Sequence, residues 1–594
     1  MTVRRIVGIE TEYGVLRTDG VHSNAMLLSS LVVSAHLPQQ PQAGRARWDY
    51  TDEDPLADAR GFRLPRAAAH PSLLTNDPSR PVASPEDHAA GASPEEFFSA
   101  QAAEFELSAG SGLTPQATAV PVTEAAATVF NGARTLQAVA VPRPERPRYD
   151  DPGAANVIVT SGARIYVDHA HPEYCSPEVT NPLDVVTWDA AGELHMDHSV
   201  QHLANREEDP VAVALFKNNV DGKGASYGTH ENFLVARSLP FDALVAGVTP
   251  FLVTRQVFAG SGRVGLGPRS ERAGFQLAQR SDYMEAEVGL ETTLRRPIVN
   301  TRDEPHADPV RWRRLHLIIG DANRFQTATY LKVGTTSLLL WFLELTSIEV
   351  QEVTGVHPRT DLSDLHARLL NLKLADPVAE VSRISHDPTL RHEVQLADGR
   401  KLTALQVQRE IEQILRAAVA RQYPQGPDHD TADLLDRWDE VLTGLETDPK
   451  LVSRYVEWVA KYVLFNRLRE RLGAEWDHPK LVALDLQWTD ISAQDSLFAK
   501  LDKSGAVHHE VSGDAVGQAK TAPPQDTRAY LRGELIRRFG PQVVGASWDS
   551  VILDLPERSD LLRLALPEPC AGGRAQYGSK LEAAQDLSDF IARA

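Results

Sequence analysis

Four short segments of the sequence have the residue pattern of a β-strand with titratable side chains on one face. They are GIETEYG from Gly8, ARIYVDHAHPEY from Ala163, GTHENF from Gly228 and RRLHLIIG from Arg313. Because side chains alternate between the two faces of a strand, the apolar residues of each segment share one face and the titratable residues share the other. The polar faces are expected to hold Glu10, Glu12, Arg164, Tyr166, Asp168, His230, Asn232, Arg314 and His316, with Glu173 following a turn at Pro172.

This combination of groups suits a metal ion or a phosphate. Carboxylates held close together repel one another and need a counter-charge. Mg²⁺ provides one through oxygen ligands, usually a few from the protein and the rest from water or phosphate. Arginines such as Arg164 and Arg302 could hold phosphate oxygens with two hydrogen bonds each. The sequence has neither a Walker loop nor a Rossmann fingerprint, so a nucleotide site would need another fold.

Each motif has a plainer explanation when it is taken alone. A Glu-x-Glu strand is often a solvated face, Asp168 could be a surface carboxylate, and His230 and His316 could be structural histidines. Cys175 is next to the cluster and could be a nucleophile, but no partner is fixed by the sequence, so a small buried residue is expected there. Spacing alone therefore indicates only a metal or phosphate site.

Composition limits the class of protein. The 594 residues allow two or more domains, and the formal charge of −20 argues against general nucleic-acid binding, which needs a basic face. Two cysteines, Cys175 and Cys570, cannot form a disulfide framework and suit a reducing cytoplasm. The sequence shows no signal-peptide core and no apolar stretch long enough for a bilayer. We therefore expect a cytoplasmic protein with neither nucleic acid nor membrane as a partner.

The amino-acid composition changes between about residues 38 and 152, where Ala, Pro, Gly and Ser dominate. We interpret this stretch as an insertion that is mobile in large part. One island within it, RWDYTDEDPLADARGF at residues 47–62, mixes aromatic, acidic and basic residues that a plain linker does not need. Outside the insertion, strands interleave with long helices, which predicts an α+β fold with an antiparallel or mixed sheet.

Five motifs in order resemble the Pup ligase/Pup deamidase family of the glutamine-synthetase-like superfamily. They are GIETEYG, RIYVDHAHPEYCSPE, LFKNNVDGKGASYGTHENF, RPIVNTRDEPHAD and RLHLIIGDAN, and the resemblance covers most of the chain outside the insertion. It implies a glutamine-synthetase-like domain over residues 1–485, with a curved antiparallel sheet flanked by helices, and a small C-terminal domain over residues 486–594. It also implies ATP and Mg²⁺ as cofactors, and the protein tag Pup and pupylated proteins as partners.

Within this family, the sequence resembles the deamidase more than the ligase. The long insertion between Glu10 and Asp168 and the island at residues 47–62 are features of the deamidase. The implied reaction is ATP- and Mg²⁺-dependent deamidation of the C-terminal glutamine of Pup, together with hydrolysis of the Pup–lysine isopeptide bond. The alternatives are a Pup–protein ligase that consumes ATP and a non-catalytic regulator that binds Pup or a nucleotide. The insertion is expected to be longer than usual, since residues 66–148 match nothing in the family pattern.

The resemblance also implies a role for individual residues. Asp168 matches the catalytic aspartate, acting either as a nucleophile or as a general base on water. The implied Mg²⁺ ligands are Glu10, Tyr166 and Glu173. The implied residues of the nucleotide site are Arg164, Ser176, His230, His316 and Trp548, whose ring could stack on adenine. Since Pup is acidic, we also expect a basic groove, for which the candidates are Arg528, Arg532, Arg537 and Arg538.

Overall fold

The computed structural model describes residues 3–22, 24–36, 46–65, 69, 137–141, 155–221, 224–492 and 496–594. The predicted mobility of the insertion concerns residues that mostly lie outside these ranges. The island at residues 47–62 and a short segment at residues 137–141 lie within them.

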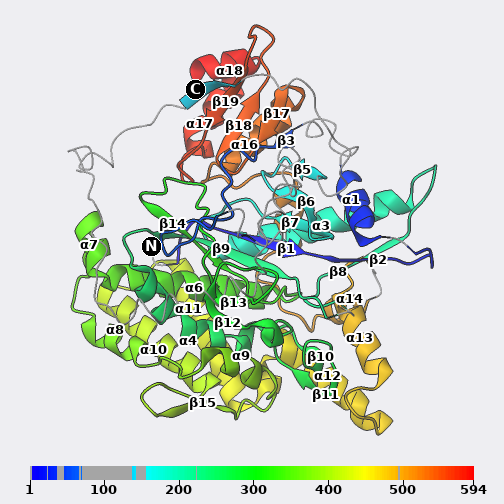
Figure 1. Ribbon diagram of the computed structural model, residues 1–594, viewed down its shortest axis with the longest axis vertical. Helices are drawn as coiled ribbons and strands as arrows, with labels where there is room; N and C mark the ends of the chain where they lie inside the picture. The colour runs from blue at the N-terminus through cyan, green and yellow to red at the C-terminus, as the bar shows by residue number, and fades with distance from the viewer. Residues whose placement is uncertain are drawn as a thin grey trace.

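An eight-stranded sheet forms the centre of the protein (Figure 1). Its strand order is β12-β13-β14-β9-β1-β7-β6-β5, and all neighbours are antiparallel except β12 and β13. The strands are β1 (Val7–Glu12), β5 (Asn156–Ile158), β6 (Arg164–Asp168), β7 (His171–Cys175), β9 (Thr229–Ala236), β12 (Ala286–Gly289), β13 (Pro297–Asn300) and β14 (Trp312–Leu317). The predicted α+β class with a largely antiparallel sheet is confirmed.

The apolar residues of this sheet pack against helices. Ile9, Phe233 and Leu315 are buried in one core with α6 (Gln326–Thr346), whose side chains are almost all buried. The other helices of this region are α4 (Phe241–Thr254), α5 (Gln256–Ala259), α7 (Ile348–Thr354), α8 (Ser363–Leu370), α9 (Pro377–Ser385), α10 (Ala404–Gln422), α11 (His429–Thr447), α12 (Glu457–Leu472), α13 (Pro479–Thr489) and α14 (Leu497–Lys503). Three two-stranded antiparallel sheets complete it: β2 (Gly14–Arg17) with β8 (Val213–Phe216), β10 (Arg263–Leu266) with β11 (Arg272–Gln276), and β15 (Glu393–Gln395) with β16 (Lys401–Thr403). Among the described helices no single one is long and apolar enough to cross a membrane, although the bent pair α6–α7 meets the criteria jointly.

A second sheet of five strands lies in the C-terminal part of the fold, at the top of Figure 1. Its order is β3-β17-β18-β19-β4, with β3 (Arg47–Trp48), β17 (Val543–Ala546), β18 (Ser550–Leu553), β19 (Leu561–Ala565) and β4 (Gln137–Val141). It is accompanied by α16 (Ala529–Phe539), α17 (Arg574–Ala583) and α18 (Leu587–Arg593). Both edge strands come from the insertion, β3 parallel to β17 and β4 antiparallel to β19. The predicted domain boundaries stay a prediction, but the C-terminal sheet draws on two segments that lie far from it in the sequence.

A buried ion-pair cluster joins the two sheets. Glu178, just after β7, accepts hydrogen bonds from Arg528 Nε at 2.7 Å and from Arg532 Nη2 at 2.5 Å. Arg532 is fully buried and also donates to the carbonyl oxygens of Gly162 at 2.9 Å and Trp548 at 2.7 Å. Burial raises the pKa of Glu178, but the two arginines outweigh it and lower this pKa to about 2. The cluster fixes the C-terminal helix α16 to the central sheet.

The predicted basic groove on α16 is therefore wrong for Arg528 and Arg532. Both guanidinium groups are buried and paired with Glu178, so neither forms part of an exposed basic surface. Arg537 and Arg538 are more exposed, but both pair with Glu534 on the same helix.

We predict that Arg532→Leu lowers the free energy of unfolding by about 3 kcal/mol, because Glu178 keeps only one of its two buried cations. Arg537→Leu is the matched control, since the Arg537 side chain is 46% exposed, and it should change stability by less than about 1 kcal/mol. Urea unfolding followed by tryptophan fluorescence measures both variants. Equal stability of the two variants would contradict the structural role of the cluster.

A pair of buried histidines anchors α1 (Ala25–Ser34) to α3 (Pro182–Ala204). His36, two residues beyond α1, lies 2.8 Å from His195 Nδ1 through its Nε2 and 3.0 Å from Ser199 Oγ through its Nδ1. Burial lowers the pKa of His36 to about 3 and that of His195 well below its ordinary value. Both rings are therefore neutral in the folded protein near neutral pH.

We predict that acid weakens this anchor. The folded-state pKa lies below the unfolded value near 6.5, so unfolding takes up protons and each histidine removes about 2 kcal/mol between pH 6.5 and pH 5. His36→Leu should be less stable at pH 7 but lose less of its unfolding temperature between pH 7 and pH 5 than the wild type. The same change at His357, which is exposed, should keep the wild-type slope. An unchanged slope in His36→Leu would contradict this origin.

Candidate active site

Strand pairing lines up the predicted residues in two rows across the central sheet. The first row crosses β6, β7, β1 and β9 and consists of Arg164, Cys175, Glu10 and His230. The second crosses β6, β7 and β1 and consists of Tyr166, Glu173 and Glu12. Residues two apart on a strand share a face, so both rows face the same side, as the sequence pattern predicted.

One cavity of about 210 Å³ opens over this face. All of the predicted site residues except Glu173 line it, and these are Glu10, Arg164, Tyr166, Asp168, Ser176, His230, His316 and Trp548. Glu173 is 1% exposed and lies in the sheet between Tyr166 and Glu12. The structure thus brings together residues from opposite ends of the chain, although their individual roles stay a prediction.

Two sets of donor atoms in this cluster have the spacing of a metal site. Glu10, Glu173 and His230 form one set, and Glu12, Asp168 and Glu173 form the other, with the atoms of each set within 4.8 Å of one another. Glu173 belongs to both sets, and its buried Oε2 has no hydrogen-bond partner among the described residues. Burial, followed by the charges of Asp168, Glu10 and Glu12, raises the pKa of Glu173 well above its ordinary value.

These residues fit divalent cations. An orphaned buried carboxylate oxygen among other carboxylates is a site where Mg²⁺ would supply the missing positive charge. Glu12 is an additional donor that the family resemblance does not imply, although its position two residues from Glu10 places it on the same predicted polar face. The phenol of Tyr166 is next to Glu173 across β6 and β7, and its predicted place among the ligands stays a prediction.

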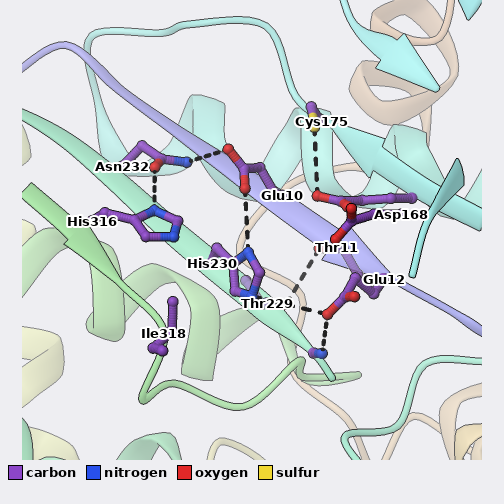
Figure 2. Close-up of polar contacts among 12 residues, drawn as sticks. Glu10, Thr11, Glu12, Asp168, Cys175, Thr229, His230, Asn232, His316 and Ile318 are labelled. Atoms are coloured by element: carbon purple, nitrogen blue, oxygen red, sulfur yellow. Dashed lines mark hydrogen bonds and ion pairs between the residues drawn. The ribbon is translucent and has the colours of Figure 1, made fainter. Parts of the chain in front are cut away.

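A hydrogen-bond network holds Glu10 beside the histidines (Figure 2). Asn232 Nδ2 donates to Glu10 Oε1 at 2.9 Å, and His230 Nδ1 lies 3.2 Å from Glu10 Oε2. Burial raises the pKa of Glu10, but His230 and Arg314 outweigh it and lower this pKa to about 2. His316 Nδ1 lies 2.8 Å from Asn232 Oδ1, and burial, helped by Arg314, lowers the pKa of His316 well below its ordinary value. Glu10 is therefore ionised and His316 neutral.

Asp168 ends β6 at the rim of the cavity, with 27% of its side chain exposed. His169 Nδ1 lies 2.7 Å from Asp168 Oδ2. Burial raises the pKa of Asp168, but His169 holds it below its ordinary value, while the Asp168 charge raises the pKa of His169 to about 9. Asp168 is thus an ionised carboxylate that is open to a substrate, next to a protonated imidazole.

The island at residues 47–62 forms one wall of the cavity. The guanidinium carbon of Arg164 lies 3.9 Å from the ring centre of Trp48 and 3.9 Å from that of Tyr166. Trp48 also meets Trp548 edge to face, with 5.1 Å between ring centres. Such stacking holds a cation by its attraction to the ring faces. The composition of the island distinguishes it from a linker, but it does not predict that these side chains belong to the site. The residues around Trp48 give no information about which distant segment Trp48 packs against.

The residues of the island that line the cavity are Tyr50 and Glu53, and Trp48 lies behind them against Arg164. Glu53 accepts a hydrogen bond from Trp48 Nε1 at 2.5 Å, and its carboxylate lies 3.9 Å from Arg164. Ser176, predicted as a nucleotide contact, uses its hydroxyl to accept a hydrogen bond from the backbone N–H of Ile9 at 3.0 Å.

Comparisons with known proteins match the chain to relatives along nearly the whole of both sequences. The family model described as Pup-ligase protein matches residues 5–552. A depupylase of Acidothermus cellulolyticus is 41% identical over 99% of this chain and 99% of its own length. A Pup deamidase/depupylase of Mycobacterium tuberculosis is 42% identical over 99% of this chain and 98% of its own length. Both matches extend over nearly the whole of each protein, and the expected extra length of the insertion at residues 66–148 stays a prediction.

A Pup–protein ligase of a Nocardioides species is 40% identical but covers only 65% of this chain. Two solved structures share the fold. The complex between prokaryotic ubiquitin-like protein Pup and its ligase PafA matches 98% of this chain and 91% of that chain with a TM-score of 0.66 at 26% identity. The ligase PafA in complex with ADP matches 78% of this chain and 98% of that chain with a TM-score of 0.61 at 30% identity. These matches confirm the predicted fold class.

We predict that Glu173→Gln weakens Mn²⁺ binding at both donor sets, whereas Glu10→Gln affects one, because Glu173 is shared. The loss should exceed about tenfold, since even an outer partner of a metal ligand contributes 10–100-fold. Electron paramagnetic resonance of free Mn²⁺ gives the number and affinity of sites. Glu287→Gln, an exposed carboxylate on β12, is the control, and an effect of Glu173→Gln no greater than that of Glu287→Gln would exclude the shared ligand.

Proposed function

Because the chain belongs to the Pup-ligase family, we propose that it removes Pup from proteins and does not attach it. It converts the C-terminal glutamine of Pup to glutamate and hydrolyses the isopeptide bond between Pup and a lysine. The observation that supports this choice is the insertion. Matches to the depupylase relatives extend over 99% of this chain, whereas the match to the ligase relative covers 65%. The insertion also supplies Tyr50 and Glu53 to the cavity lining, and Trp48 stacks behind them on Arg164.

The cavity binds a nucleotide in this proposal. A ligase of the same fold is known in complex with ADP, and the cavity offers the corresponding chemistry in Arg164 and Arg302 for phosphates and Trp548 for a planar base. ATP with Mg²⁺ is the proposed form. Bound Mg²⁺ would neutralise the carboxylates and polarise oxygen atoms of phosphate and substrate.

Asp168 is the proposed catalytic residue. Its ionised carboxylate either attacks the amide carbonyl carbon, giving an anhydride that water then opens, or takes a proton from an attacking water. In both routes the leaving nitrogen departs as ammonia or as the lysine amine and needs a proton. The protonated His169, 2.7 Å from Asp168, is a suitable donor for it. Arg302 and Arg314, which line the cavity, would stabilise negative charge that develops on the carbonyl oxygen.

The two alternatives are weaker. A ligase would use a similar nucleotide cavity, but the ligase relative leaves about a third of this chain unmatched. A non-catalytic regulator would not need a partly exposed, ionised Asp168 beside a set of acidic donors. We place the activity in the cytoplasm, where the free thiols of Cys175 and Cys570 stay reduced.

We predict that Asp168→Asn lowers the conversion of Pup-Gln to Pup-Glu by about 10³-fold or more, while the affinity for ATP stays close to that of the wild type. Mass spectrometry of Pup and ammonia release measure conversion, and nucleotide fluorescence measures binding. Asp209→Asn, an exposed aspartate, is the control. Stoichiometric ADP release with conjugation of Pup to a lysine would instead support the ligase. Binding of Pup-Gln without conversion in the wild type would support the regulator.

A further inference from the structure

The turn that carries Asp168 has an unfavourable sequence for its shape. Asp168 and His171 pair across β6 and β7, so His169 and Ala170 alone connect the strands. Both have positive φ angles, +42° for His169 and +73° for Ala170. A two-residue hairpin of this kind strongly favours Asn-Gly, because residues with a Cβ atom are strained at positive φ. This strain persists only where surrounding contacts hold the backbone.

One such contact comes from α1, which lies beside β6 and β7 (Figure 1). The hydroxyl of Ser29 is fully buried and donates a 2.7 Å hydrogen bond to the carbonyl oxygen of Ala170. The helix itself is firmly placed. Leu28, Val32 and Val33 pack in one core with side chains of β6 and β7, and His36 pairs with His195 on α3.

The Ser29 hydrogen bond is specific to the turn. Its acceptor is the main-chain carbonyl oxygen of Ala170, so the bond restrains the backbone of the turn and not a side chain. The apolar residues around Ser29 already bury α1 against the sheet, so the helix does not depend on this hydroxyl for its place. The neighbouring Ser30 is partly exposed, and its hydroxyl has no partner among the residues that the structure describes.

We propose that Ser29 is a positioning residue for the reaction, one that holds the strained β6–β7 turn and thereby aims the carboxylate of Asp168 into the cavity. This rests on the proposed function of Asp168. Without the Ser29 hydrogen bond the turn populates relaxed backbone conformations in which Asp168 and His169 leave their places at the cavity rim. Substrate and nucleotide contacts elsewhere in the cavity are unchanged.

The test compares Ser29→Ala with Ser30→Ala, the same substitution one position along the helix. Ser29→Ala should lower kcat for Pup-Gln by about fivefold, the effect of losing one hydrogen bond, with KM and ATP affinity unchanged. Ser30→Ala should keep the wild-type kcat. A rise in KM or a loss of ATP binding in Ser29→Ala, or an equal fall in kcat in both variants, would overturn the positioning role.

A second variant separates turn strain from general instability. Ala170→Gly removes the Cβ penalty at positive φ, so Ser29→Ala should cost less activity in the Ala170→Gly background than in the wild-type background. If the two losses are equal, strain in the turn does not explain the role of Ser29. Loss of folding in Ser29→Ala that Ala170→Gly does not correct would show a structural role only and would also overturn the proposal.

Hydrogen exchange measured by mass spectrometry tests the effect of Ser29 on the turn without an activity assay. Peptides that contain residues 168–171 should exchange faster in Ser29→Ala than in Ser30→Ala, while peptides from α3 exchange equally. If the wild type does not convert Pup-Gln but this difference is present, the proposed function fails and the turn contact stands. If the wild type is active and the exchange is equal, the turn contact fails alone.

Discussion

Repulsion among four carboxylates is the constraint around which the site is built. Glu10, Glu12, Asp168 and Glu173 converge on one face of the central sheet. Their carboxylates, together with His230, form two sets of donor atoms that each lie within 4.8 Å of one another. Two of the carboxylates have a cation beside them, because Glu10 pairs with Arg314 and Asp168 with His169. Within the part of the chain that the structure describes, no ion pair to Glu173 is formed, and its raised pKa marks the place where positive charge is missing.

The period-two pattern predicted this face well, because strand geometry follows directly from local sequence. It placed Glu10 with Glu12, and Arg164 with Tyr166 and Asp168, as the register of β1, β6 and β7 has them. The resemblance to a known family then predicted the cavity residues, including Trp548, which is distant in sequence. Neither the strand pattern nor the family resemblance predicted which remote segments of the chain pair with each other. The strand Gln137–Val141 joins β19, and nothing in its composition indicates that partner.

The error over Arg528 and Arg532 has a related cause. A helix with several arginines has the same sequence pattern whether it faces solvent or a single buried carboxylate. The difference lies in Glu178, about 350 positions earlier in the chain, which pairs with both arginines in the interior. Local charge patterning contains no information about such a distant counter-ion.

The two insertion strands at opposite edges of the C-terminal sheet have a consequence for how this family could diversify. The chain between β3 and β4 starts and ends on one rigid platform, and three strands separate its ends, a distance of roughly 19 Å at the usual strand spacing of about 4.8 Å. Lengthening a loop with fixed ends costs entropy that grows only with the logarithm of its length. Evolution can therefore add or delete residues there while Trp48 keeps its place against Arg164.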